Sequence, residues 1–64
     1  MRIVLVSFAN PEDFKVVGDS SCNPIPREGE SVNLAYNPFL KVLKITYDYD
    51  NQVVAVVVDG IVNI

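Results

Sequence analysis

The chain has 64 residues, a formal net charge of −3 from eight acidic and five basic side chains, and no histidine. A chain of this length forms one domain at most and buries only about 60% of the surface that it exposes when unfolded. The lack of histidine excludes a nucleophile activated by an imidazole base, and the acidic balance disfavours nucleic acid, because attraction to phosphates needs a positive field. We therefore expect no catalytic residues and no nucleic-acid partner.

Small domains usually need a disulfide, a metal or association to become stable. Cys22 is the only cysteine, so no intramolecular disulfide can form, and a lone thiol fits a reducing compartment. One cysteine without histidine makes no zinc site, and no cofactor is indicated. Residues 1–8 lack the features of a signal peptide, and no apolar run is long enough to span a membrane. We expect a cytoplasmic protein, not a membrane protein, that is stabilised by association.

Valine, isoleucine and aromatic residues dominate while alanine and leucine are scarce, which favours strands over helices. We expect an all-β chain with one β-barrel domain over residues 1–64, either a small SH3-like barrel or a strongly bent antiparallel sheet of five to six short strands in meander order. The predicted elements are a strand over 2–8, a turn over 10–13, a strand over 14–17, a loop over 19–30, strands over 31–36, 39–49 and 53–59, and a short final segment over 61–64.

The last predicted strand lies in "NQVVAVVVDGIVNI", where the aliphatic run is unbroken. Side chains alternate across a strand, so Val53, Ala55 and Val57 point one way while their neighbours point the other way. One set can fill the barrel. The other needs a loop or a second chain to cover it, because an exposed apolar strand aggregates. We expect a homo-oligomer, most simply a two-fold dimer. Its predicted interface consists of Val54, Val56, Val58, Ile61 and Val62.

The stretch "NPIPREGESV" in the long loop presents Arg27 and Glu28 on a turn, and Gly29 can adopt a positive φ there. The loop is either a rigid rim that carries a charged pair to a partner or simply the start of the next strand. Tyrosine is a favoured interface residue, although alternation along 39–49 directs two of the tyrosines toward the interior. The predicted partner-binding residues are Arg27, Glu28, Tyr36, Tyr47 and Tyr49.

Two further patterns favour ordinary structural roles. Asp48, Asp50 and Asp59 are spaced like the first, third and twelfth positions of a calcium loop, but Val53 stands where that loop needs glycine, and the flanking elements are strands. No cationic neighbour in the sequence lowers the pKa of Cys22, which favours a passive cysteine. We expect a hairpin turn at Asp50 and no metal site.

The segments "PREGESV" and "KVLKITYDYDNQVVAVVVD" resemble a class of very small, mostly uncharacterised proteins of bacteriophages and bacterial mobile elements. That class has a Pro-Arg-x-Gly-Asp/Glu-x-Val turn, then a strand with an aromatic-Asp pair, a tight turn and a valine-rich strand. The resemblance covers about half of the chain and implies a small β-barrel of phage or mobile-element origin. The matching residues are Pro26, Arg27, Gly29, Glu30 and Val32, followed by Tyr47, Asp48, Val54, Val56 and Val58.

Short phage proteins of this kind commonly bind and block a host protein, including components of antiviral defence. The expected function is therefore that of a non-enzymatic, homo-oligomeric inhibitor of a host protein. Two alternatives remain open: a protein that sequesters a signalling nucleotide between subunits, with Arg27 binding the small anionic ligand, and a virion or assembly component.

Overall fold

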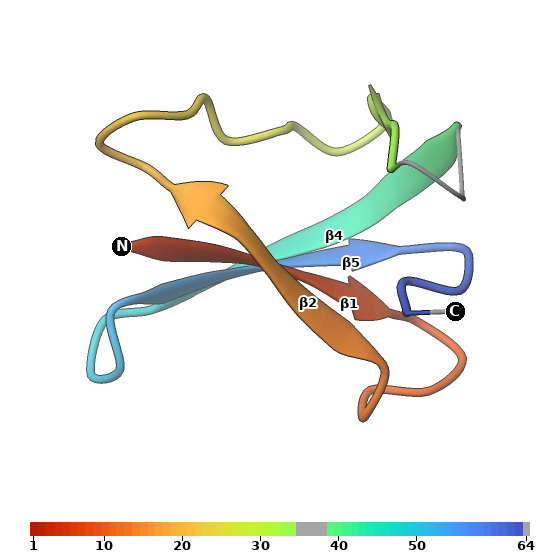
Figure 1. Ribbon diagram of the computed structural model, residues 1–64, viewed down its shortest axis with the longest axis horizontal. Helices are drawn as coiled ribbons and strands as arrows, with labels where there is room; N and C mark the ends of the chain where they lie inside the picture. The colour runs from red at the N-terminus through yellow and green to blue at the C-terminus, as the bar shows by residue number, and fades with distance from the viewer. Residues whose placement is uncertain (35–38, 64) are drawn as a thin grey trace.

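The computed structural model describes residues 1–34 and 39–63, and within these residues the chain forms strands, turns and loops without a helix (Figure 1). The all-β prediction is confirmed. Residues 35–36 of the expected strand over 31–36 lie outside the described residues, and within the described part the strand ends at Val32. No sixth strand follows Gly60 within the described residues. The strands are β1 (Arg2–Ser7), β2 (Phe14–Asp19), β3 (Ser31–Val32), β4 (Leu40–Asp48) and β5 (Val53–Val58).

The five strands form one mixed sheet in the order β2-β1-β5-β4-β3. β1 and β5 are parallel, whereas the other neighbouring strands are antiparallel, so the expected meander order is wrong. The reason lies in the composition of these two strands. Both are nearly continuous aliphatic runs, a composition typical of strands that are covered on both faces, and the two pair at the centre of the sheet.

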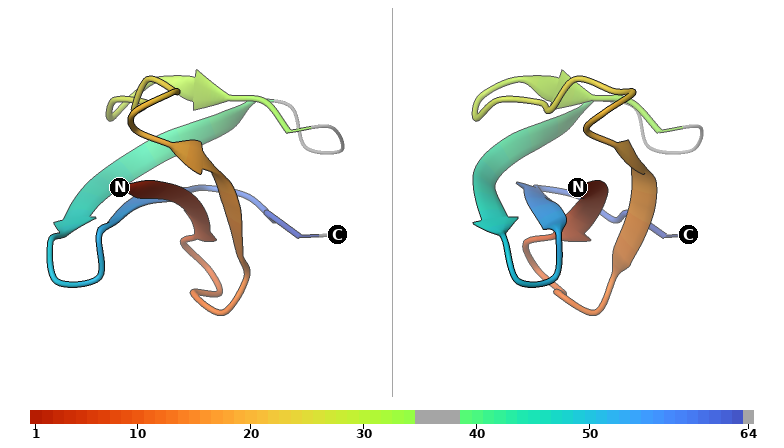
Figure 2. Two further views of the ribbon diagram at one scale, coloured as in Figure 1. Left: turned by 60° about the vertical axis from the view of Figure 1, so that its left-hand side comes forward. Right: turned by 90° about the vertical axis from the view of Figure 1, so that its left-hand side faces the viewer.

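The sheet curls into a half-barrel, and the loop over residues 20–30 crosses its open side from β2 to β3 (Figure 2). Ile25 in this loop packs against the core. The end of the loop is fixed to β4 by two hydrogen bonds, from Gly29 N–H to the Val42 carbonyl (2.9 Å) and from Val42 N–H to the Glu30 carbonyl (2.8 Å). The long loop therefore completes the core that the half-barrel leaves open.

The core lies on the inner face of the curl, where Ile3 of β1 is paired with Val54 of β5 and Leu5 is paired with Val56. The valines of β5 that point inward are 0% exposed within a single chain. The prediction that they form an oligomer interface is wrong, because the flanking strands and the crossing loop already cover them. The core consists of Ile3, Leu5, Leu40, Val42, Val54, Val56, Val58 and Val62.

The segment after β5 is held against the turn between β1 and β2 by one carboxylate. Asp13 accepts hydrogen bonds from the backbone N–H groups of Val62 (2.8 Å) and Asn63 (2.7 Å), and the Asn63 side chain donates to the Phe14 carbonyl. Val62 is thereby buried in the core, which also removes it from the predicted interface, whereas Ile61 is 61% exposed.

Candidate functional site

The outer face of the sheet, on the side away from the core, is also apolar. Here we define the outer face as two rows of side chains in register across β2, β1 and β5. Packing within the chain leaves Phe14 54% and Val16 50% exposed, and the members from β5 are half-buried. The rows are Val16, Val4 and Ala55, and beside them Phe14, Val6 and Val57.

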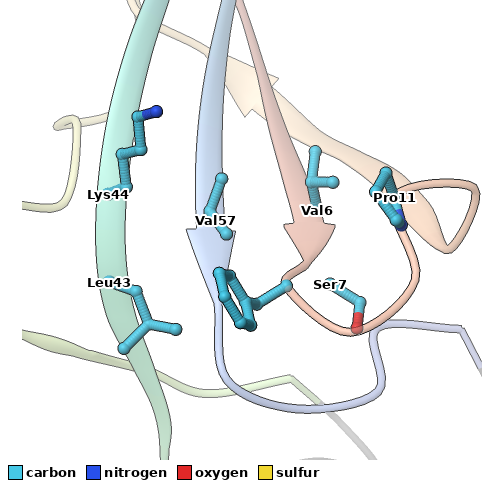
Figure 3. A pocket seen from close by; sticks show the side chains of 7 residues that line it. Val6, Ser7, Pro11, Leu43, Lys44 and Val57 are labelled. Carbon is cyan, nitrogen blue, oxygen red and sulfur yellow. The ribbon is translucent and has the colours of Figure 1, made fainter.

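The outer face continues at one end into a shallow hollow with a volume of about 480 Å³. Val6 and Val57 lie side by side on the central strands, and Pro11 lies in the turn that forms one wall (Figure 3). The opposite wall is formed by Leu43 and Lys44 of β4. Residues that line the hollow are Val6, Ser7, Phe8, Pro11, Leu43, Lys44 and Val57.

A β-bulge explains why two consecutive residues of β4 line the same hollow. Val42 pairs with Val58 and Lys44 pairs with Val57, so Leu43 is an extra residue without a partner in β5. Side chains of consecutive strand residues normally point to opposite faces, and a bulge changes the direction of one of them. Leu43 thereby faces the hollow together with Lys44, although the sequence pattern directed it inward.

Lys44 is the one charged residue among the described residues that line the hollow. In the described part of the chain, the only ion pair joins the amino group of Met1 to the Asp19 carboxylate at 3.8 Å. The Lys44 ammonium group therefore has no carboxylate partner among residues 1–34 and 39–63. The hollow offers an apolar floor with one positive charge at its wall.

The hairpin between β4 and β5 carries a second apolar feature, a pair of stacked tyrosines. The ring centroids of Tyr47 and Tyr49 are 6.2 Å apart with 15° between the planes, and Tyr49 is 71% exposed. The predicted hairpin turn is confirmed, with Gln52 at a φ of 56°. Asn51 donates to Asp48 from its side chain and its backbone, and these hydrogen bonds lower the pKa of Asp48. The aromatic patch is therefore ordered by its own turn.

The other predicted partner-binding residues lie elsewhere. The turn that presents Arg27 and Glu28 is attached to β4 at Val42. Tyr47 lies five residues farther along the same strand, which corresponds to roughly 16 Å. Tyr36 lies outside the described residues. The predicted set therefore does not form one surface: the two tyrosines of β4 and its turn are together, and the charged turn is at the other end of the strand.

The surroundings of Arg27 are unfavourable for an anion. Its backbone N–H donates to the Glu30 carboxylate (2.5 Å), and Glu30 also lines a hollow of about 290 Å³ beside the prolines of the loop. An anionic ligand at Arg27 would meet this carboxylate as well. Repulsion between like charges would offset part of the attraction.

Cys22 is exposed in a tight loop segment, and its sulfur atom lies 3.6 Å from the Ser21 hydroxyl. The backbone N–H of Ser21, and then its hydroxyl, lower the pKa of Asp19. Within residues 1–34 and 39–63, no three histidine, cysteine or acidic side chains are grouped so that they could bind a metal ion. The same residues include no helix that is long and apolar enough to cross a bilayer.

Sequence reasoning missed the outer face and its hollow. The first strand carries aliphatic residues of both parities, so its pattern did not indicate which set lies outside, and no signal in the sequence marked the bulge at Leu43. Phe8 follows directly after β1 and gave no indication that it would border a hollow. Comparison with protein-family models, with curated protein sequences and with solved structures finds no match to this chain.

Proposed function

We propose that this chain is a non-enzymatic interaction protein that acts by covering a surface of a partner protein. The observation that carries the proposal is the apolar outer face, where half of each of two adjacent side chains, Phe14 and Val16, remains exposed. Soluble single chains rarely leave contiguous apolar surface of this kind uncovered, and such patches mark interaction sites. The polar residues Thr46 and Lys44 border it on β4, as polar rims border protein interfaces.

The stacked tyrosines support the same function from another place. Tyr47 and Tyr49 are exposed, and their stacking orders them before any partner binds, which lowers the entropy lost on binding. Tyrosine is enriched among the residues that contribute most to binding energy. Tyr47 is paired with Val54 and so belongs to the side of the sheet opposite to the outer face. We propose that the tyrosine pair extends the contact to a second region of the partner.

The resemblance to phage and mobile-element proteins indicates the kind of partner. We propose a cytoplasmic host protein that the chain binds and blocks. The homo-oligomer is then the form of the chain before its outer face binds this partner. The role of Arg27 in nucleotide binding is the less favoured alternative, because the Glu30 carboxylate lies beside it.

Affinity capture from a host lysate, followed by mass spectrometry, tests the proposal when it is run with matched variants. Phe14→Thr/Val16→Thr removes apolar surface from the outer face while keeping residues that favour strands. Tyr49→Ser alters the hairpin instead. We expect one host protein to be captured by the wild-type chain and lost with the Phe14/Val16 variant, and a smaller loss with Tyr49→Ser. Equal capture by the wild-type chain and the Phe14/Val16 variant would contradict the role of the outer face, and the absence of any captured protein would contradict the function.

A further inference from the structure

One of the side chains that line the hollow is a large aromatic residue that its own chain leaves mostly uncovered. Phe8 is 70% exposed although it borders an apolar cavity. Its backbone is fixed, because Phe8 N–H donates to the Val58 carbonyl at 2.9 Å and continues the pairing of β1 with β5. The turn that follows is also ordered, since Ser7 N–H donates to the Asp13 carbonyl and Asp13 N–H donates to the Asn10 carbonyl, both at 2.9 Å. A mostly exposed aromatic ring on a fixed backbone and a hollow are therefore adjacent on one surface.

We propose that the hollow is occupied by Phe8 of a second copy of this chain, in a two-fold dimer. This inference rests on the proposed role of the outer face as a protein interface, and because both occupants use that face, the dimer dissociates when a host protein binds. A two-fold axis parallel to β1 and β5 places the turn of each copy against the β4 wall of the other copy. Each Phe8 then enters the opposing hollow, and each hollow receives one Phe8. Such a contact is self-complementary and closed, so it produces a dimer and not a filament.

Charge supports a second copy as the occupant. Glu12 follows Pro11 in the turn on one side of the hollow, and Lys44 lies on the opposite side. Both side chains are exposed, and within the described residues neither has an ion-pair partner in its own chain. The two-fold arrangement brings Glu12 of one copy to Lys44 of the other, twice per dimer. The surface is thus complementary to itself in charge as well as in shape.

Size indicates how tight this dimer is. The hollow, about 480 Å³, falls within the range of roughly 300–1,000 Å³ typical of pockets that bury a drug-sized group, so an aromatic ring and its neighbours fit. Four strands of about six residues make a face of roughly 400 Å² in projection. Stable interfaces bury about 800 Å² on each partner. The dimer is therefore expected to dissociate on dilution.

The free edge of β2 is a poorer place for a second copy. Its pairing with β1 shifts register between Ile3 and Val4, which leaves Val17 as an extra residue, and Lys15 is exposed on the strand. Bulges and lysines on an edge strand oppose the addition of another strand. Association by packing of the outer faces avoids this obstacle.

Sedimentation velocity over a range of protein concentrations tests the dimer. We expect the mass to rise from one chain to two as concentration increases, and Phe8→Ser to raise the dissociation constant by roughly a hundredfold or more, because two central aromatic contacts are lost. Tyr49→Ser is the matched control: Tyr49 is as exposed as Phe8 but lies on the hairpin, so the constant stays unchanged. Thermal unfolding of each variant verifies that it is folded.

A charge exchange identifies the occupant as a second copy. We expect Glu12→Lys alone and Lys44→Glu alone each to weaken the dimer by roughly tenfold at low salt, since each replaces two attractive pairs with two repulsive pairs. The double variant Glu12→Lys/Lys44→Glu restores both pairs with reversed sign and returns the constant to within about threefold of the original. Only association of identical chains gives this recovery.

Three results would overturn the inference: a single chain at every concentration, a dimer that Phe8→Ser does not weaken, or a double variant that stays as weak as the single ones. The proposed function is tested separately by capture of a host protein. A monomeric chain that still loses its host protein on Phe14→Thr/Val16→Thr overturns the dimer and retains the function, whereas a dimer that captures nothing supports the dimer and contradicts the function.

Discussion

The inner and outer faces of β5 carry the same kind of side chain in different surroundings. Val54, Val56 and Val58 are fully buried by their own chain, whereas the residues between them are only half-buried. The difference does not come from composition, because valine occurs on both sides. It comes from the curl of the sheet and from the loop that crosses only the open inner side (Figure 2). A strand this apolar needs cover on both faces, and one chain provides it on one.

We expect the largest difference between the two faces when adjacent valines of β5 are replaced and the losses in the free energy of unfolding are compared. We expect Val56→Ala to lower the free energy of unfolding by about 2–3 kcal/mol, because it removes fully buried methyl groups and leaves a cavity. Val57→Ala is the matched control and should cost well under 1 kcal/mol, because its side chain is half-buried on the outer face. Urea unfolding at low protein concentration measures both. Equal losses in the free energy of unfolding would show that the chain covers both faces of β5 to the same extent.

The carboxylate of Asp13 holds the segment after β5, which covers one end of the inner face with Val62. Asp13→Asn replaces one of two accepting oxygens by an amide group, so one N–H of Val62 or Asn63 loses its acceptor. We expect a loss of about 1–2 kcal/mol and faster amide exchange at Val62. Glu12→Gln, at the neighbouring position, should change stability by less than about 0.5 kcal/mol in the monomer. Unchanged exchange at Val62 would contradict this role of Asp13.

Stability should be nearly insensitive to the exposed part of the outer face. Phe14→Thr is expected to change the free energy of unfolding of the single chain by at most about 1 kcal/mol, because half of the ring is already in water and threonine favours strands. Chemical unfolding well below the dissociation constant of the dimer measures this. A cost comparable to that of Val56→Ala would show that Phe14 packs as tightly as the core.

The smallest expected effect is a pH dependence at the hairpin. Hydrogen bonds from Asn51 lower the pKa of Asp48 below its usual value of 3.8, so they stabilise the fold above that pH, and the contribution is lost as the pH falls through the folded-state pKa. The difference in stability between the wild-type chain and Asn51→Ala should therefore shrink as the pH drops below about 3.8. Asn10→Ala removes a side-chain acceptor of the Glu12 N–H and should show a difference that does not depend on pH in this way.

The strands and the hairpin could be predicted because they depend on local patterns. Valine-rich runs and turn residues located β1, β2, β4 and β5 to within two residues at each end. The inside of β5 could not be predicted, since a continuous aliphatic run has no polar residue to mark the wet face. The parallel pairing of β1 with β5 depends on contacts between distant segments, and the loop over 19–30 covers the core through Ile25, a role that a loop composition does not indicate.

The candidate site could be predicted only in part. Alternation indicated apolar side chains on both sides of β5, as the structure has them, but the predicted interface residues lie on the side that the chain buries itself. The stacking of Tyr47 with Tyr49 agrees with the expected aromatic patch. The hollow could not be predicted, because it depends on the bulge at Leu43 and on the position of Phe8 beside a strand far away in the sequence.

The pairing of the first strand with the last one has a consequence for biosynthesis. β1 pairs with β2, which follows it directly in the sequence, but its other neighbour, β5, is synthesised about fifty residues after it. Until β5 is made, one edge of β1 has no strand to pair with. The pairing of β1 with β5 joins segments about fifty residues apart in sequence, and contacts between such distant segments slow folding. Truncation within β5 would therefore leave an aggregation-prone fragment and not a smaller folded protein.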